Sequence, residues 1–320
     1  MTTPHFGYTL SSEEHSPSSL VANALAAEAV GFDYVSISDH FHPWIDRQGH
    51  SPFVWSVIGG IAATTERVGL GTGVTCPTTR IHPVIIAQAA ATSACMMPGR
   101  FVLGVGTGES LNEHITGEHW PEYEVRAERL EESIEVIRAL WTGENTSHHG
   151  RHYTVENARI YDVPAELPAI IVAAGGPRSA ELAARVGDGL WLSSVDGETI
   201  DAYRQAGGAG PIYAQVQVCW GPSKEEALRL AHEAWPNAGI KGQASQELPS
   251  PAHFEELAEM VKPEDMAEEL PHGPDVTEIL GALTSAVDAG VTHVHVHQIG
   301  PDQAAFLDMA RTELLPQLRG

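Results

Sequence analysis

Eight short stretches of the chain are continuously apolar or alternate between apolar and polar residues, and amphipathic stretches separate them. Short patterns of this kind are typical of buried β-strands, whereas a period near 3.6 residues is typical of a helix. The stretch SLVANALAAEAVG is helical in pattern and ends at Gly31, and RAERLEESIEVIRALW has the same period. The predicted strands are residues 6–10, 33–39, 67–74, 101–108, 169–176, 189–194, 212–220 and 293–300.

Eight strands, each followed by at least one helix, predict an α/β fold of the closed (β/α)8 type, the TIM barrel. A doubly wound sheet is the alternative, but it commonly has fewer strands and needs a switch point. A barrel of this kind accommodates 320 residues in one unit, so we expect residues 1–320 to form one domain.

Two segments interrupt the alternation of strands and helices. Residues 148–164 predict a small hairpin after the fourth helix, and the Pro-rich residues 234–275 predict an insertion with short helices between strands seven and eight. Insertions that follow strands lie at the C-terminal face of a barrel, where active sites are built.

The composition excludes several classes of function. The chain has 18 basic and 42 acidic residues, a formal charge of −24, which repels nucleic acid and anionic membranes. No apolar run approaches the roughly 20 residues that span a bilayer, and MTTPHFGYTL lacks the regions of a signal peptide. The cysteines are too few and too scattered for a disulfide framework or a zinc site. We expect a cytoplasmic protein with a small-molecule substrate.

The second predicted strand runs into the sequence SDHFHPW, which places Asp39, His40 and Trp44 at the barrel mouth. Histidine is suited to exchanging a proton near neutral pH, and a tryptophan could line a flat ring system. Alternatively, His40 and His42 cap a loop and Trp44 fills a surface hollow. No further ligand follows the two histidines at suitable spacing, so we expect no metal.

The third and fourth strands end in GTGVTCPTTR and GVGTGESLNE. Gly73 beside Val74 indicates either a bulge or a close approach of the backbone to something flat. The second sequence nearly matches a dinucleotide fingerprint, but Glu109 stands where its third glycine should be. Glu109 and Asn112 then lie at the mouth beside Gly106. Glu109 is either a proton donor in a covered pocket or a solvated helix cap.

The fifth strand ends in AAGGPRS, which predicts a turn and the start of a helix. Backbone N–H groups there could cradle an anion, with Arg178 and Arg80 as local positive charge; a plain tight turn is the alternative. The residues of this predicted cradle are Ala174, Gly175, Gly176, Pro177 and Arg178.

The last strand, HVHVHQIG, places His293, His295 and His297 on one face. Residues two apart along a strand lie about 7 Å apart, which is too far for a shared metal ion. We expect His297, the last of the three, to face the site, and the other two to pack in barrel layers or against helices.

Taken together, these motifs resemble a known family. The sequences SDHFHPW, LGTGVTCPT, VGTGESLNE, IYDVP, AAGGP and GDG occur in this order in the luciferase-like barrel superfamily. They look most like its coenzyme F420-dependent oxidoreductases, of the branch typified by F420-dependent glucose-6-phosphate dehydrogenase. The resemblance is dense over residues 6–195, weak over 196–290, and returns at HVHVHQIGPDQAAFL.

The resemblance implies F420 as cofactor and hydride transfer as the reaction. It implies that His40 removes the substrate hydroxyl proton, that Glu109 protonates the reduced deazaflavin, and that Trp44 lines the substrate pocket, with His297 expected there too. It further implies a homodimer. The implied cofactor contacts are Asp39, Asn112, the AAGGP turn and a cis peptide bond between Gly73 and Val74.

The chain departs from the sugar-phosphate enzymes where they bind phosphate. Asp196 stands where a lysine is expected, and residues 263–310 contain no Lys or Arg. We therefore expect a neutral substrate, either an alcohol or a carbonyl, imine or alkene for the reverse reaction, rather than glucose 6-phosphate. An FMN-dependent monooxygenase and a non-catalytic F420-binding barrel remain the alternatives.

Overall fold

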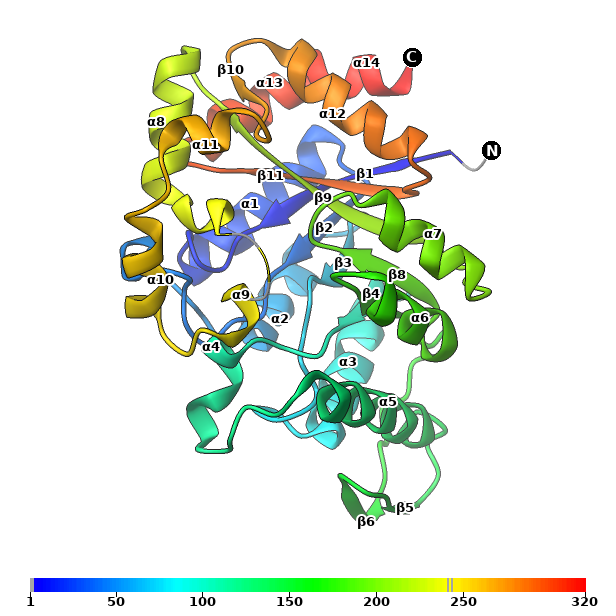
Figure 1. Ribbon diagram of the computed structural model, residues 1–320. Coiled ribbons are helices and arrows are strands. Elements are labelled where there is room, and N and C mark those ends of the chain that lie inside the picture. Colours follow the sequence, from blue (N-terminus) through cyan, green and yellow to red (C-terminus); the bar gives the residue numbers. More distant parts are fainter. Residues whose placement is uncertain (1–2, 241, 243) are drawn as a thin grey trace.

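The computed structural model describes residues 3–240, 242 and 244–320, and eight parallel strands in it form a closed barrel (Figure 1). Each strand pairs with its neighbour in the order β11-β1-β2-β3-β4-β7-β8-β9, and β9 closes the ring by pairing with β11. The TIM barrel and its eight strands are thereby confirmed. The strands are β1 (His5–Leu10), β2 (Tyr34–Ile37), β3 (Gly69–Thr72), β4 (Phe101–Val105), β7 (Ile170–Ala173), β8 (Gly189–Leu192), β9 (Ile212–Trp220) and β11 (His293–Gln298).

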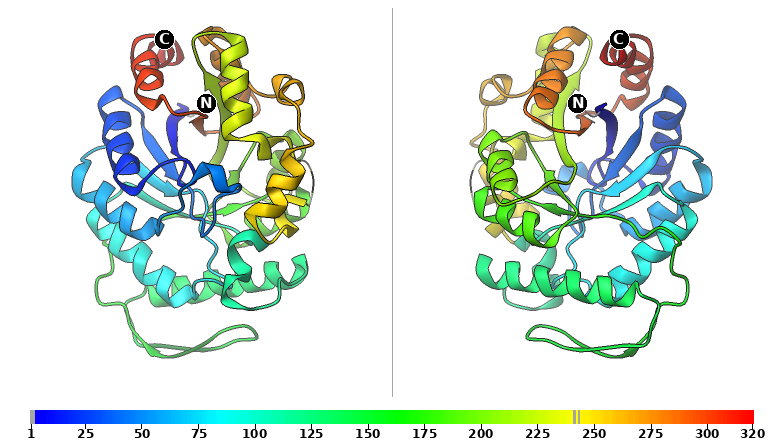
Figure 2. Two further views of the ribbon diagram at one scale, coloured as in Figure 1. Left: turned by 90° about the vertical axis from the view of Figure 1, so that its left-hand side faces the viewer. Right: turned by 90° about the vertical axis from the view of Figure 1, so that its right-hand side faces the viewer.

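Helices surround the strands on the outside of the barrel (Figure 2). None of the helices in the described part of the chain combines the length and the apolar character needed to cross a bilayer. The main helices are α1 (Pro17–Val30), α2 (Val54–Thr64), α3 (Pro83–Met96), α5 (Tyr123–Leu140), α6 (Pro177–Val186), α7 (Gly197–Gln205), α8 (Lys224–Ala234), α12 (Val276–Asp288), α13 (Gln303–Met309) and α14 (Leu315–Arg319).

The first helix shows how the local sequence sets its ends. The Ser16 side chain accepts a hydrogen bond from the backbone N–H of Ser19, and Pro17 occupies the first turn. Gly31 ends the helix with a φ of 106°, a left-handed conformation that glycine adopts without a steric penalty. The predicted helix boundary at Gly31 is therefore confirmed.

Aromatic rings fill the inside of the barrel. Trp191 and Tyr213 stack with their ring centroids 5.2 Å apart, and Tyr34 meets Tyr213 edge-on at 5.7 Å. A Cβ atom on Gly7 would lie 2.6 Å from the Tyr34 ring, and one on Gly73 would lie 2.6 Å from Trp191. Glycines on the strands therefore make room for these rings, and the flat group that closely approaches Gly73 in the structure is an indole.

The two predicted interruptions are both present. The hairpin pairs β5 (Thr146–His149) with β6 (Thr154–Ala158), and it begins slightly earlier than predicted. The insertion after β9 contains short helices, and Figures 1 and 2 show them on the side of the barrel that carries α4 (Ser110–Glu113). Its elements after α8 are η3 (Pro236–Gly239), α9 (Ala244–Glu247), α10 (Pro251–Ala258), α11 (Pro263–Ala267) and β10 (His272–Gly273).

Candidate active site

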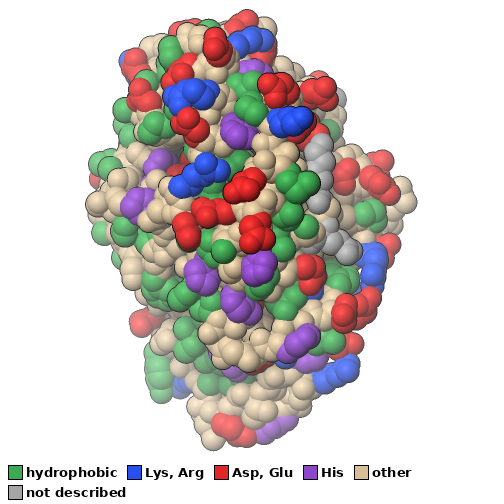
Figure 3. All heavy atoms as spheres, turned by 60° about the vertical axis from the view of Figure 1, so that its left-hand side comes forward, with side chains coloured by type: hydrophobic (Ala, Val, Ile, Leu, Met, Phe, Trp, Pro, Cys, Tyr) green, Lys and Arg blue, Asp and Glu red, His purple; other side chains and the backbone are tan. Residues whose placement is uncertain are grey.

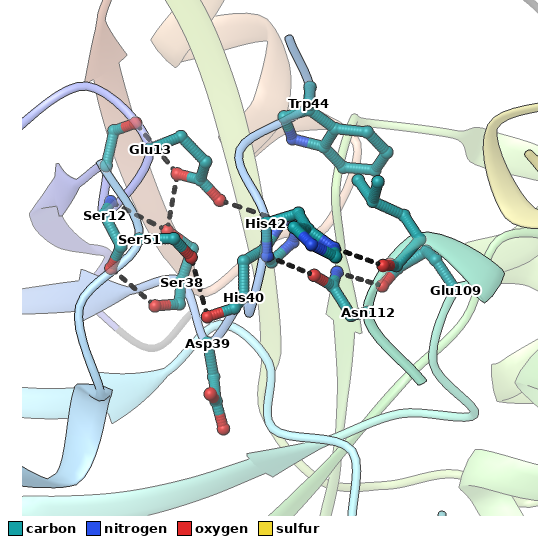
Figure 4. A network of polar contacts seen from close by, with 12 residues as sticks. Ser12, Glu13, Ser38, Asp39, His40, His42, Trp44, Ser51, Glu109 and Asn112 are labelled. Atoms are coloured by element: carbon teal, nitrogen blue, oxygen red, sulfur yellow. Dashed lines mark hydrogen bonds and ion pairs between the residues drawn. The ribbon is translucent and has the colours of Figure 1, made fainter. Parts of the chain in front are cut away.

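His40 lies just beyond the end of β2, and its partner is a carboxylate from the loop after β1 (Figure 4). The Nδ1 atom of His40 is 3.2 Å from Glu13 Oε1, an ion-pair distance without the alignment of a hydrogen bond. Glu13 is buried, and its Oε2 accepts hydrogen bonds from the hydroxyls of Ser11 at 3.0 Å and Ser38 at 2.8 Å. The other ring nitrogen of His40, Nε2, is therefore the one left to meet a substrate.

Glu13 was not among the residues predicted from the sequence. The available signal was its position, a carboxylate three residues beyond the first barrel strand. A position past a strand end indicates the mouth of the barrel, but it does not indicate which histidine a side chain will meet.

Trp44 forms an apolar wall beside His40. Its ring lies edge-on to His40 with centroids 4.9 Å apart and edge-on to Phe254 of α10 at 5.2 Å. The Gln48 side chain fixes this position: its Oε1 accepts the Trp44 backbone N–H at 2.9 Å, and its Nε2 donates to the Ala234 carbonyl at 3.1 Å. The insertion after β9 is thus attached to the loop that carries His40 and Trp44.

Asn112 connects the two loops that carry His40 and Glu109. Its Oδ1 accepts the backbone N–H groups of Phe41 at 2.9 Å and His42 at 3.1 Å, and its Nδ2 donates to Glu109 Oε2 at 3.4 Å. Glu109 occupies the N-cap position of α4, as the helix-cap alternative has it, but its side chain makes no capping hydrogen bond. Figure 4 shows His40, Asn112 and Glu109 in one polar cluster next to Trp44.

The side chain of Asp39 points in a different direction from that of His40, and Figure 4 shows its carboxylate directed away from the histidine. Its Oδ1 lies 2.9 Å from Arg80 Nη2, and its Oδ2 accepts a hydrogen bond from the Thr75 hydroxyl. Arg80 also lies 3.4 Å from Glu113 Oε1. Burial raises the pKa of the Glu113 carboxyl, against the opposing effect of Arg80. Arg80 was predicted to supply local positive charge at the anion cradle, and in the structure its guanidinium is paired with two carboxylates.

The segment after β3 continues along the end of β4. The peptide bond between Gly73 and Val74 is cis, as the resemblance implied. Thr75 donates its backbone N–H to the Gly104 carbonyl at 2.9 Å and accepts that of Gly106 at 3.0 Å. A Cβ atom on Gly106 would lie 2.9 Å from a Val74 methyl group, so the absence of a side chain allows these two segments to pack.

The AAGGP turn leads into α6 with a backbone open on one side. A Cβ atom on Gly176 would meet nothing within 4 Å, and Pro177 is the first residue of the helix. The guanidinium of Arg178 lies 2.6 Å from the Glu124 carboxylate at the surface. The local positive charge predicted at Arg178 is thus paired with a carboxylate, and backbone N–H groups remain the candidate anion ligands. Ala174 is buried, and Gly175 donates its N–H to Ser179 Oγ at 3.1 Å.

The three histidines of β11 lie in different environments. Burial lowers the pKa of His295 to about 3 and that of His293 to about 4, and both rings pack among the aromatic rings of the barrel. Their predicted role in layer packing is confirmed. His297 is 2% exposed, with Nε2 2.8 Å from Glu14 Oε2. Within the described residues, no group of three His, Cys, Asp or Glu side chains could hold a metal ion.

Comparison with known proteins assigns the chain to a family. The model of the luciferase-like monooxygenase family matches residues 1–293. The F420-dependent glucose-6-phosphate dehydrogenase of Tsukamurella paurometabola is 37% identical over 100% of this chain and 99% of that protein. The enzyme of the same name from Beutenbergia cavernae is 38% identical over 98% of this chain and 97% of that protein. The chain belongs to the luciferase-like family, in its branch of F420-dependent oxidoreductases.

A solved structure is similar over the whole chain. It is an F420-dependent secondary alcohol dehydrogenase in complex with an F420–acetone adduct, with 27% identity, a TM-score of 0.93 and 100% coverage of both chains. The F420-dependent tetrahydromethanopterin reductase of Methanopyrus kandleri is 20% identical with a TM-score of 0.80, which supports the fold alone.

The residues present fit the cofactor of this branch. The start of α6 offers backbone N–H groups with no side chain over Gly176, as a phosphate group requires. His40, with a side chain that is 10% exposed, and the nearby Glu109 provide two proton-exchanging groups in one cluster. The roles of Asp39 and Asn112 as cofactor contacts, and of His297 in the substrate pocket, stay predictions.

Proposed function

We propose that the chain oxidises a neutral, non-phosphorylated alcohol with coenzyme F420, or catalyses the reverse reduction of a carbonyl, imine or alkene. The observation that carries this proposal is the His40–Glu13 pair in the same polar cluster as Glu109. Oxidation of an alcohol requires a base at the hydroxyl and a hydride acceptor at the carbinol carbon, and F420 supplies the acceptor when bound.

Each of the protein's own groups would have a separate role in the reaction. His40 Nε2 accepts the hydroxyl proton, and the Glu13 carboxylate at Nδ1 stabilises the imidazolium that forms. Glu109 holds the second proton-exchanging position, and Trp44 with Phe254 keeps water from one side of the site. The AAGGP turn and the Gly73–Val74 segment would hold the cofactor.

The sequence around the expected phosphate site argues for a neutral substrate. Asp196 is the N-cap residue of α7, and its carboxylate accepts the backbone N–H groups of Glu198 at 3.2 Å and Thr199 at 3.3 Å. A carboxylate in that position repels a phosphate dianion. The positive charge of Lys224, the first residue of α8, is already paired with Glu278. On the side of the molecule with α8 and α10, acidic side chains predominate over basic ones (Figure 3).

Two measurements test the proposal. F420 and FMN are mixed separately with the apoprotein, and quenching of cofactor fluorescence is followed; tight binding of FMN alone would favour the monooxygenase alternative. Propan-2-ol and glucose 6-phosphate are then compared as substrates. We expect turnover of the neutral alcohol, and turnover of glucose 6-phosphate at about 1 mM would reject the neutral-substrate proposal.

The His40→Ala variant tests whether the chain is a catalyst that uses this base. We expect a rate loss of about 10²- to 10⁴-fold with nearly unchanged affinity for F420, because the proton acceptor is lost while the AAGGP turn is retained. An unchanged rate would remove His40 from the mechanism. Absence of turnover in the wild-type protein with intact F420 binding would favour the alternative of a non-catalytic F420-binding barrel.

A further inference from the structure

Two consecutive glutamates in the loop after β1 reach histidines on opposite sides of that strand. β1 lies between β11 and β2 in the barrel, so its loop has the ends of both neighbours within reach. Glu13 meets His40 beyond β2, and Glu14 meets His297 of β11. The same short segment therefore carries the partner of the candidate base and a second ion pair.

The Glu14 pair is a firm attachment. Glu14 Oε2 lies 2.8 Å from His297 Nε2, and Glu14 Oε1 accepts the backbone N–H of Gly300 at 3.3 Å. The side chains of Glu14 and His297 are 7% and 2% exposed. The Trp235 ring packs edge-on against His297 at 4.7 Å, and the Gly300 carbonyl accepts Gln303 Nε2 at 2.7 Å. Glu14 thus connects the loop after β1 to the turn at Gly300, which Gln303 of α13 also contacts.

The contact between Glu13 and His40 depends more strongly on the position of the loop than the contact between Glu14 and His297 does. Its Oε1 is 3.2 Å from His40 without hydrogen-bond alignment, whereas Oε2 is bound to Ser11 and Ser38. A displacement of the loop by about 1 Å would break the contact with His40, and displacements of that size cost about 10²-fold in rate when they disturb reacting groups.

We propose that Glu14 and His297 are positioning residues for the reaction: together they hold the loop after β1 so that Glu13 stays against His40. The catalytic part of this inference rests on the proposed function, whereas the effect on the His40 ring exists without cofactor or substrate. The length of the Glu14 side chain, which allows it to contact His297 and Gly300, is then more important for the reaction than its negative charge.

Two substitutions separate reach from charge. Glu14→Asp keeps the charge and withdraws the carboxylate by one methylene, while Glu14→Gln keeps the length and removes the charge. In the Glu14→Gln variant, the new side-chain amide can donate a hydrogen bond to Nε2 of a neutral His297 if the ring proton moves to Nδ1. This change of tautomer breaks no existing hydrogen bond of Nδ1, because His297 Nδ1 has no partner in the structure. We expect Glu14→Asp to lower kcat by about 10- to 100-fold with a nearly unchanged KM, and Glu14→Gln to remain within about 3-fold of wild type.

A cycle with Glu13→Gln tests whether the effect passes through Glu13. We expect Glu14→Asp to change kcat by less than about 2-fold in the Glu13→Gln background, because coupled residues are non-additive. In the apoprotein, NMR of ¹⁵N-labelled histidine at one fixed pH reports the His40 ring nitrogens. The shifts in Glu14→Asp should approach those of Glu13→Gln, and those in Glu14→Gln should resemble wild type.

Several results would overturn the inference. Equal losses in Glu14→Gln and Glu14→Asp would show that reach does not outweigh charge, and a larger loss in Glu14→Gln would show that charge matters more. Additive effects with Glu13→Gln, or unchanged His40 shifts in Glu14→Asp, would show that Glu14 does not act through Glu13. If the wild-type protein turns over no alcohol, the proposed function fails, and the NMR measurement still decides whether Glu14 positions the Glu13–His40 pair.

Discussion

Arg80 Nη2 lies 2.9 Å from Asp39 Oδ1, and both side chains are buried at the mouth of the barrel. The same guanidinium lies 3.4 Å from Glu113, so one cation compensates two carboxylates from two other loops. A buried charge without a partner is far more costly than an exposed one. Arg80 therefore holds together the loops after β2, β3 and β4 around the candidate site.

The first prediction concerns this cluster. Arg80→Met keeps the side-chain length but leaves Asp39 and Glu113 without a cation, so we expect the free energy of unfolding to fall by about 3–5 kcal/mol. Urea unfolding at neutral pH measures the loss. Arg185→Met is the matched control, because Arg185 pairs with Glu131 at the surface and should cost less than about 1 kcal/mol. Equal losses in the two variants would contradict the assignment.

The second prediction concerns the hairpin and Glu132 of α5. Glu132 Oε1 accepts the Tyr153 backbone N–H at 2.8 Å and lies 3.0 Å from His148 Nε2, while Oε2 accepts the His152 N–H at 2.9 Å. Burial alone would raise the pKa of the Glu132 carboxyl, but these hydrogen bonds lower it overall. Because the pKa is lower in the folded state, ionised Glu132 stabilises the fold above its unfolded pKa of about 4.3 and ceases to do so as pH falls through the folded value.

We therefore expect Glu132→Gln to lose about 1–3 kcal/mol of unfolding free energy at pH 7, with a difference from wild type that shrinks below about pH 4. Urea unfolding at several pH values measures this. Glu128→Gln is the control, because Glu128 pairs with Arg151 and His152 at the surface and should change stability little at any pH. A difference that grows on acidification would be the wrong sign.

The periodicity of apolar residues was sufficient to predict the barrel, because the strand and helix periods are local properties of the chain. It also placed His40, Trp44 and Glu109 at strand ends, which parallel strands bring to one face. It did not predict the partner of each side chain. Arg80 and Asp39 are 41 residues apart, and Glu14 and His297 are 283 apart, so only the pairing of β2 with β3 and of β1 with β11 brings them together.

The third prediction tests Glu109 as the second proton-exchanging group. Glu109→Gln keeps the size and the contact with Asn112 but removes the exchangeable proton, so we expect a fall in kcat of about 10²- to 10⁴-fold. Steady-state rates of F420 reduction measure it. Glu118→Gln, which changes a surface carboxylate paired with Arg129, should leave kcat unchanged. A Glu109→Gln variant with full activity would show that Glu109 only supports Asn112.

The last prediction concerns the inside of the barrel. An added Cβ atom on Gly7 would lie 2.6 Å from the Tyr34 ring, and that ring has little freedom to move, because its hydroxyl is 3.1 Å from His295 Nδ1 and Tyr213 packs against it. We expect Gly7→Ala to lower the free energy of unfolding by about 1–3 kcal/mol through overpacking.

Gly59 in α2 is the matched position, because an added Cβ atom there meets nothing within 4 Å. Gly59→Ala should raise the free energy of unfolding by about 0.5–1 kcal/mol, since alanine favours a helix over glycine. Urea unfolding of both variants measures the two opposite changes. If both variants lost stability equally, the cost of Gly7→Ala could not be attributed to Tyr34. If Gly7→Ala left the free energy of unfolding unchanged, the Tyr34 ring would have more room to move than the packing inside the barrel indicates.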